Sequence, residues 1–216
     1  MRFSKSMNKN LSYIGVFKNE ANRMRYILDM VKPLVTEMHL GVQPSDDDTL
    51  KIAREYTENV YELPAQAPFY SKDFLMSQVK TPWACWFDAD EILSIPLYNY
   101  LSGLDFSLMG EYEAIRVPRI NYINGVICEG GQEKDHQFMI LRKDVRWNPT
   151  PERAIHIWPK VTQHFTIEFP VYHIRSLDKI VKRTKDWDVI QPDLTEVCHG
   201  YVDKVKEELN NYKQND

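Results

Sequence analysis

Apolar runs alternate with amphipathic segments through the first half of the chain. Four runs rich in β-branched and aromatic residues, at 11–17, 35–42, 60–63 and 83–87, predict buried strands. Segments beginning near Glu20, Ser45 and Ser71 carry apolar residues at helical spacing, with Asn19 as the expected cap of the first. Strand and helix thus alternate three times before a fourth strand, which predicts an α/β fold with a largely parallel sheet.

The pattern changes after about Pro96. Strands are predicted at 115–123, 137–141, 154–158 and 166–174, with turns at Asn124-Gly125 and Gly130-Gly131. Helices are predicted at 177–187 and 194–212. We expect one domain over residues 1–216, with a nucleotide-binding half at 1–95, a more antiparallel half at 96–176 that shapes a pocket, and C-terminal helices at 177–216.

Composition excludes few classes of protein. Of the 216 residues, 43% are hydrophobic and 27% charged, which is typical of a globular chain. A net charge of -4 gives no general attraction to nucleic acid. Cys85, Cys128 and Cys198 lack zinc-site spacing, so we expect reduced thiols and a cytoplasmic protein. Neither a signal peptide nor a membrane span is predicted.

Three carboxylates follow the fourth predicted strand, in the segment Asp88-Ala89-Asp90-Glu91. Strands of an open α/β sheet deliver their last residues to the crevice where ligands bind. Carboxylates so close together repel one another unless a cation lies between them. The segment therefore predicts a divalent metal site that carries a phosphorylated ligand, and the structural alternative is that Asp88 or Asp90 caps a helix.

Other polar segments should converge on the same edge of the sheet. These are Lys18-Asn19-Glu20, the stretch from Gln43 to Thr49, and a longer segment that leads to Lys72. Neither GxGxxG nor GxxxxGK[ST] occurs, so a nucleotide would be held by side chains and metal rather than by a glycine-rich loop. The acidic run at 46–48 also suits a first helical turn, and Lys72 alone also fits a surface position.

Residues 13–93 resemble the family-2-type glycosyltransferases of the GT-A fold, in their short bacterial and phage-like form. The resemblance rests on Lys18-Asn19-Glu20, on Ser45, Asp47 and Thr49, on Lys72-Asp73, and on the strand that ends in Asp-Ala-Asp-Glu. The second half matches through 135–142, Trp147, Glu152 and His173. Met139 and Pro151 stand where the family commonly has Arg and His, and Val42 or Gln43 stands where an aspartate often binds uracil.

The resemblance implies a GT-A, Rossmann-like sheet with helices on both faces, and an enzyme that uses a nucleotide sugar with Mn²⁺ or Mg²⁺. A UDP-sugar is the donor expected most, although the missing aspartate leaves the base open. Asp90 would hold the metal, with Asp88 beside it and His173 as a further ligand or a structural residue. The expected donor-binding residues are Lys18, Asn19, Glu20, Gln43, Asp47, Lys72 and Asp88.

The resemblance also implies an inverting transfer, which requires a carboxylate to take the acceptor's proton. Glu152 is the first candidate for this base and Asp135 the second. Glu91 would hold the acceptor or orient residues that contact the substrate. The acceptor stays open between a glycan, a protein and a modified base of phage DNA, as does the oligomeric state. A nucleotidyltransferase and a binding or assembly protein without catalysis are the alternative functions.

Overall fold

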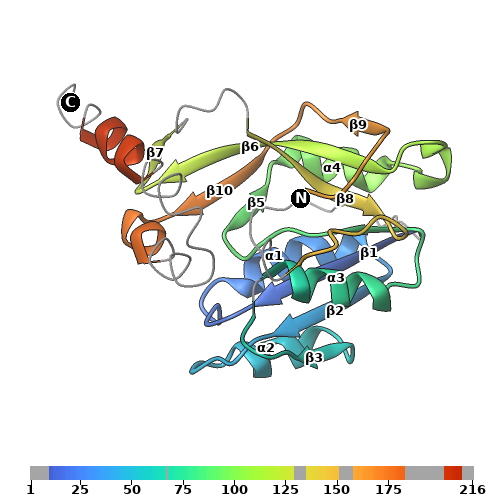
Figure 1. Ribbon diagram of the computed structural model, residues 1–216, viewed down its shortest axis with the longest axis horizontal. Helices are drawn as coiled ribbons and strands as arrows, with labels where there is room; N and C mark the ends of the chain where they lie inside the picture. Colours follow the sequence, from blue (N-terminus) through green and yellow to red (C-terminus); the bar gives the residue numbers. More distant parts are fainter. Residues whose placement is uncertain (1–9, 67, 129–134, 151–157, 183–201, 211–216) are drawn as a thin grey trace.

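The computed structural model describes residues 10–66, 68–128, 135–150, 158–182 and 202–210 (Figure 1). The strands are β1 Leu11–Phe17, β2 Glu37–Val42, β3 Val60–Glu62, β4 Trp83–Cys85, β5 Glu91–Leu93, β6 Ala114–Ile123, β7 Val126–Ile127, β8 Asp135–Arg142, β9 His164–Thr166 and β10 Val171–Arg175. The helices are α1 Met24–Val31, α2 Thr49–Tyr56, α3 Pro68–Gln78 and α4 Ile95–Gly103, with 3-10 turns η1 Lys32–Leu34 and η2 Phe106–Met109. Residues 177–182 and 202–210 are also helical.

The strands form one sheet in the order β3-β2-β1-β4-β8-β6-β10-β5, with β7 and β9 paired to β6. The first four strands are parallel to one another. The β4–β8, β8–β6 and β10–β5 pairs are antiparallel, whereas β10 runs parallel to β6. This confirms the predicted α/β class, with a parallel first half followed by a more antiparallel second half.

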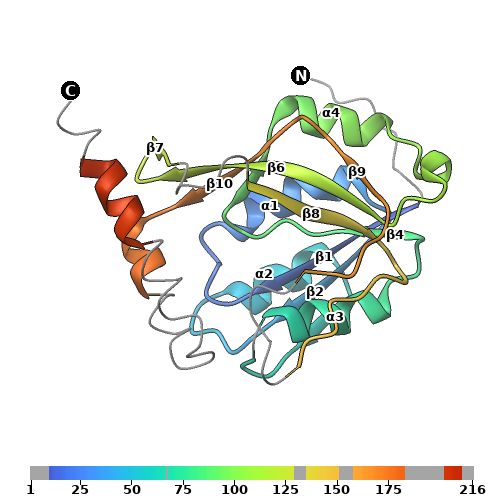
Figure 2. The same ribbon diagram turned by 45° about the horizontal axis from the view of Figure 1, so that its top comes forward.

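Helices cover both faces of the parallel half, as predicted. Helices α1 and α2 lie together on one face, and α3 covers the other (Figures 1 and 2). The pairing of Arg25 with Glu55 at 2.6 Å and a hydrogen bond from Tyr56 to Asp29 link α1 to α2. The arrangement follows from right-handed crossovers, because the chain moves outward from β1 to β3 and then returns across the sheet to β4.

The centre of the core is β1, which is buried almost throughout. Gly15 lies between the rings of Tyr13 and Phe17, where an added Cβ would come within 2.6 Å of the Phe17 ring. The absence of a side chain at Gly15 therefore lets these two rings close over the same face of the strand. The hydroxyl of Tyr13 donates to the carbonyl of Phe87 at 2.6 Å and so ties β1 to the segment before Asp88.

Several sequence expectations about element boundaries were wrong. The helix expected from Ser45 begins at Thr49, so the acidic run at 46–48 precedes it, and the strand expected over 83–87 ends at Cys85. Helix α1 begins at Met24 rather than at Glu20, because Asn19 has a positive φ of 54° and its side chain accepts from the amide of Asp46 instead of capping a helix. The strand expected over 166–174 is two strands, β9 and β10, with Pro170 just before the second. The turn at Asn124-Gly125 is confirmed.

Several expectations fall on residues outside the described part of the chain. These include the turn at Gly130-Gly131, most of the strand expected over 154–158, and Cys198. Cys85 and Cys128 are free, buried thiols. No helix among the described residues is long and apolar enough to cross a membrane.

A second, small core attaches the C-terminal helices to the tip of the β6–β7 hairpin. It contains Ile123, Cys128, Ile180, Val202, Val205 and Leu209. This satellite core is separate from the main core, which spans β1 to β10. The C-terminal helices therefore pack on the second half of the sheet at its far end (Figure 1).

The bond from Tyr13 to Phe87 predicts a measurable loss of stability. Replacing Tyr13 with Phe removes the donor to a buried carbonyl and should lower the free energy of unfolding by about 1–3 kcal/mol in urea titrations. Tyr26→Phe is the matched control, since Tyr26 is 70% exposed. Equal stability of the two variants would contradict the structural role of the Tyr13 hydroxyl.

Candidate functional site

The acidic segment after β4 is a closed turn. The carbonyl of Asp88 accepts from the amide of Glu91 at 2.9 Å, and the amide of Asp88 donates to the Glu91 carboxylate at 2.8 Å. The segment continues into strand β5, and the next helix, α4, is capped by Ser94. Asp88 and Asp90 therefore cap no helix, and the helix-cap alternative is wrong.

Strand β5 brings Asp90 against His173 of β10. The two strands pair with Glu91 opposite His173, and the amide of Ile174 donates to the carbonyl of Asp90 at 2.7 Å. In this register the Asp90 Oδ1 lies 3.6 Å from the Nε2 of His173. Both side chains are almost entirely buried. The sequence prediction that these residues belong to one site agrees with this geometry.

The imidazole of His173 is oriented by Asn121 on β6. Asn121 and His173 are partners in the parallel β6–β10 pair, and the Asn121 Oδ1 lies 2.8 Å from the His173 Nδ1. With the proton on Nδ1, the imidazole donates to this amide oxygen and directs its Nε2 lone pair toward Asp90. Burial lowers the pKa of His173 to about 4, so the ring is neutral at pH 7. A neutral imidazole held in this way is suited to bind a metal.

A line of ionisable side chains runs from the buried Glu91 of the turn to the partly exposed Arg119 of β6 and Asp135 of β8. Arg119 of β6 lies 3.6 Å from the Glu91 carboxylate and contacts Asp135 at 2.5 Å. A second bond, from the Nε of Arg119 to the same oxygen of Asp135, measures 2.6 Å. Burial and the nearby charge of Asp88 raise the pKa of Glu91, and the Arg119 guanidinium opposes this. Asp135 therefore orients the guanidinium of Arg119.

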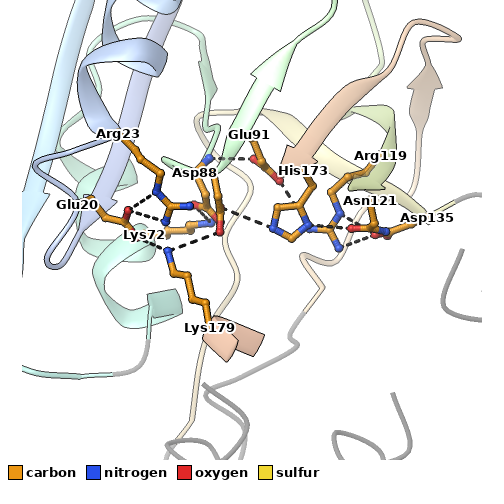
Figure 3. Close-up of polar contacts among 11 residues, drawn as sticks. Glu20, Arg23, Lys72, Asp88, Glu91, Arg119, Asn121, Asp135, His173 and Lys179 are labelled. Atoms are coloured by element: carbon orange, nitrogen blue, oxygen red, sulfur yellow. Dashed lines mark hydrogen bonds and ion pairs between the residues drawn. The ribbon is translucent and has the colours of Figure 1, made fainter. Parts of the chain in front are cut away.

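Cationic side chains flank the carboxylates. Lys72 of α3 lies 3.2 Å from Asp88 and within 5.4 Å of the Trp86 ring centre. Lys179, in the helix after β10, lies 2.7 Å from Glu20 and 3.8 Å from Asp90 (Figure 3). The second carboxylate oxygen of Glu20 pairs with Arg23 at 2.7 Å. The site thus alternates acidic and basic groups.

These residues face a cavity of about 460 Å³. That volume is in the range of small-molecule sites. Its lining includes the sequence-predicted residues Lys18, Glu20, Gln43, Lys72, Asp88, Asp90, Glu91 and His173. It also includes Arg119, Gln137, Phe138, Trp147 and Trp158 from the second half. Both halves of the chain therefore contribute to one pocket.

Asn19 and Asp47 hold two loops together beside this pocket. The amide of Asn19 donates to the hydroxyl of Ser45 at 3.0 Å, and the amide of Ala21 donates to Asp47 at 3.0 Å. The other oxygen of Asp47 accepts from the amide of Thr49. Their described bonds fix the end of β1 against the start of α2. Glu152, the first candidate base, lies outside the described residues.

Gln43 is buried at the end of β2, where its side chain lines the cavity. Its amide nitrogen donates to the carbonyl of Gln66 at 2.8 Å and to the hydroxyl of Ser71 at 3.2 Å. The side-chain nitrogen of Gln43 is therefore already hydrogen-bonded within the protein. The carbonyl oxygen is therefore the atom with which Gln43 can meet a ligand.

Two tryptophans of the second half, Trp147 and Trp158, line the cavity but differ in exposure. Trp147 is buried against Trp86, with ring centres 4.7 Å apart, so it belongs to the core. Trp158 is 51% exposed and rests edge-on against Phe138 at the cavity wall. Trp158 is thus the aromatic side chain with area available for stacking on a ligand.

The donor set fits a cation that protein and ligand share. No group of three or more His, Cys, Asp or Glu side chains gathers as a metal cage in the part of the chain described by the structure. Asp90 and His173 supply an oxygen and a nitrogen on facing sides of a small gap. Mg²⁺ is usually bound through one or two protein carboxylates together with substrate phosphates and water, so a phosphorylated ligand would complete such a site.

Sequence reasoning missed Arg119, Asn121 and Lys179. Arg119 and Asn121 are two positions apart and so share one face of β6, and polar residues in an otherwise apolar strand were the available signal. Lys179 offered no signal, because a lysine on a charged helix resembles any solvated position.

No protein-family model and no curated protein matches the chain. Among solved structures, S. aureus TarS has a TM-score of 0.48 and 12% identity, with 83% of this chain and 39% of that chain covered. A glucosyl-3-phosphoglycerate synthase from Mycobacterium tuberculosis in complex with Mg²⁺ and uridine diphosphate has a TM-score of 0.42 and 13% identity, with 63% and 57% covered. The chain thus matches about two-fifths and somewhat over half of their respective lengths.

The raised pKa of Glu91 predicts a pH dependence of stability. Since the folded state holds this proton more tightly than the unfolded state, wild-type stability should fall as the pH rises above the ordinary carboxyl value of 4.5. Glu91→Gln cannot ionise and should show a smaller fall between pH 5 and 8 in thermal unfolding with EDTA present. Glu58→Gln, at an exposed position, is the control. Parallel curves for wild type and Glu91→Gln would contradict the assignment.

Proposed function

We propose that this protein is a metal-dependent glycosyltransferase that moves a sugar from a nucleotide-sugar donor to a hydroxyl acceptor. The observation that carries the proposal is the Asp90–His173 pair, which opens on a cavity at the carboxyl ends of parallel strands. Asn121 orients the histidine as a metal ligand, and Lys18 and Lys72 line the same cavity. A divalent cation and a diphosphate together match this set of charges.

Each part of the donor has a complementary group. Asp90 and His173 would hold Mn²⁺ or Mg²⁺, which would neutralise charge on the departing diphosphate. Asp88, whose side chain is 42% exposed, would bind a hydroxyl of the ribose or the sugar, with Lys72 holding its other side. The Gln43 oxygen would accept from an N–H on the base edge, as uracil presents at its N3. We therefore propose a UDP-sugar as the donor.

The second half of the chain would bind the acceptor and supply the base. We propose an inverting transfer with Glu152 first and Asp135 second as the base, and Glu91 as a group that holds the acceptor. The base must come within about 2.6–3.2 Å of the attacking hydroxyl. The bonds from Arg119 to Asp135 weaken the case for Asp135, since they occupy one of its oxygens. Trp158 offers a ring face on which a sugar acceptor could stack.

Metal-dependent donor binding is the first test of this function. Titration calorimetry with UDP, GDP and CDP should show UDP binding with Mn²⁺ and little binding in EDTA. Asp90→Asn should weaken UDP binding at least about tenfold, because it removes one charged ligand of the cation. Asp203→Asn, at an exposed position of the C-terminal helix, should bind like wild type. Equal UDP affinity with Mn²⁺ and with EDTA would refute the metal-dependent mechanism.

The assignment of the base has a separate test. Glu152→Gln and Asp135→Asn should each be measured for UDP affinity and for release of UDP from a UDP-sugar with an acceptor panel. The true base variant should keep UDP affinity and lose about a hundredfold or more in turnover. If both variants keep near-normal turnover, Glu91 becomes the residue to examine. Sugar-nucleotide binding without any turnover would instead support a non-catalytic binding protein.

A further inference from the structure

Lys179 enters the candidate metal site from outside the sheet. It lies in the helical residues 177–182 that follow β10, and its ammonium reaches both Glu20 at 2.7 Å and Asp90 at 3.8 Å (Figure 3). Glu20 belongs to the segment after β1, and Asp90 to the turn after β4. A single ammonium thus bridges the two acidic segments of the nucleotide-binding half.

The neighbouring side chain fixes the direction of this lysine. Ile180 is 2% exposed and packs in the satellite core with Ile123 and Val205. Because Ile180 anchors the helix to the β6–β7 hairpin, Lys179 is held on the side that faces Glu20 and Asp90. Its own side chain is 32% exposed, so the ammonium has room to change partner.

The two carboxylate oxygens of Asp90 face two different side chains. Its Oδ1 faces His173, and its Oδ2 faces Lys179. A cation bound between Asp90 and His173 would therefore share this carboxylate with the ammonium. Two positive charges a few ångströms apart repel strongly, so metal binding and the Lys179–Asp90 contact oppose each other.

We propose that Lys179 neutralises Asp90 in the metal-free protein, leaves this carboxylate when metal binds, and then pairs with the donor's diphosphate. This inference rests on the proposed function. Lysine suits such an exchange because its charge sits on a flexible four-carbon chain. Glu20 stays neutralised after the exchange, since Arg23 pairs with its other oxygen at 2.7 Å. Lys179 is thus a positioning residue for the donor, contributed by the C-terminal helix.

The test uses Lys179→Met, which removes the charge at similar size, and Lys179→Arg, which retains it. Lys182→Met is the matched control, since Lys182 is exposed on the same helical segment. Two affinities are measured for each full-length variant: that for Mn²⁺ alone, by electron paramagnetic resonance, and that for UDP at saturating Mn²⁺, by calorimetry.

Lys179→Met should bind Mn²⁺ alone more tightly than wild type, by about tenfold, because the competing charge is gone. The same variant should bind UDP at saturating Mn²⁺ more weakly, by about tenfold, because a charged partner of the diphosphate is lost. Lys179→Arg and Lys182→Met should stay close to wild type in both measurements. A purely structural lysine would instead weaken both affinities on replacement by Met.

The proposal is overturned if Lys179→Met leaves the Mn²⁺ affinity unchanged or weakens it, or if it leaves the UDP affinity at saturating Mn²⁺ unchanged. Wild-type protein that binds Mn²⁺ but none of UDP, GDP and CDP would refute the proposed function. In that case the measurement with Mn²⁺ alone still decides whether Lys179 competes for Asp90. Absence of Mn²⁺ binding by every variant would overturn the inference as well.

Discussion

The pairing of β5 with β10 is the constraint on which the site depends. The chain leaves the parallel half at β4 and, five residues later, pairs with a strand at the other end of the sheet order. The connection must therefore cross the edge of the sheet at which β4 ends, past the first residues of β8 and the last residues of β6 and β10. Its first aspartate faces Lys72 of the first half of the chain, and its second faces His173 of the second half. The hydrogen bond from Ile174 to the Asp90 carbonyl holds that crossing in one register.

The buried charges beside this crossing fix orientation more than they add stability. Removing Glu91, Arg119 and Asp135 from water is costly, and their mutual attraction offsets that cost only in part. What they provide is geometry. Arg119 is held by Asp135, and it in turn lies beside the carboxylate that closes the acidic turn. In the same way Asn121 selects the tautomer of His173. Arg119 and His173, which line the cavity, are thus each supported by a partner from a neighbouring strand.

The parts of this arrangement that could be predicted are those set by local pattern. Strand β1 has the predicted bounds because its seven residues are uniformly suited to a buried strand. Asp88 and Asp90 were recognisable because carboxylates directly follow an apolar strand.

Strand β5 was not predicted, since a three-residue strand is defined by its distant partner rather than by its own sequence. Arg119 and Lys179 were missed for a related reason: their roles arise from pairing with residues of other segments, such as Glu91 for Arg119 and Glu20 for Lys179. Asn19 was misread as a cap because its left-handed backbone depends on contacts with the next loop.

The satellite core under the C-terminal helices has a thermodynamic consequence for the whole molecule. A small cluster with few apolar members can open locally without unfolding the main sheet, and amide exchange would detect such sub-global opening. The helix it anchors carries a charge that contacts Asp90, so opening of the cluster and occupancy of the acidic turn are linked equilibria. Linkage is reciprocal. A ligand that displaces the Lys179 ammonium favours opening of the satellite core, and a partner that stabilises the closed satellite core lowers the affinity for that ligand by the same factor. Any partner that binds residues 202–210 would therefore change the ligand affinity of the acidic turn without contacting it.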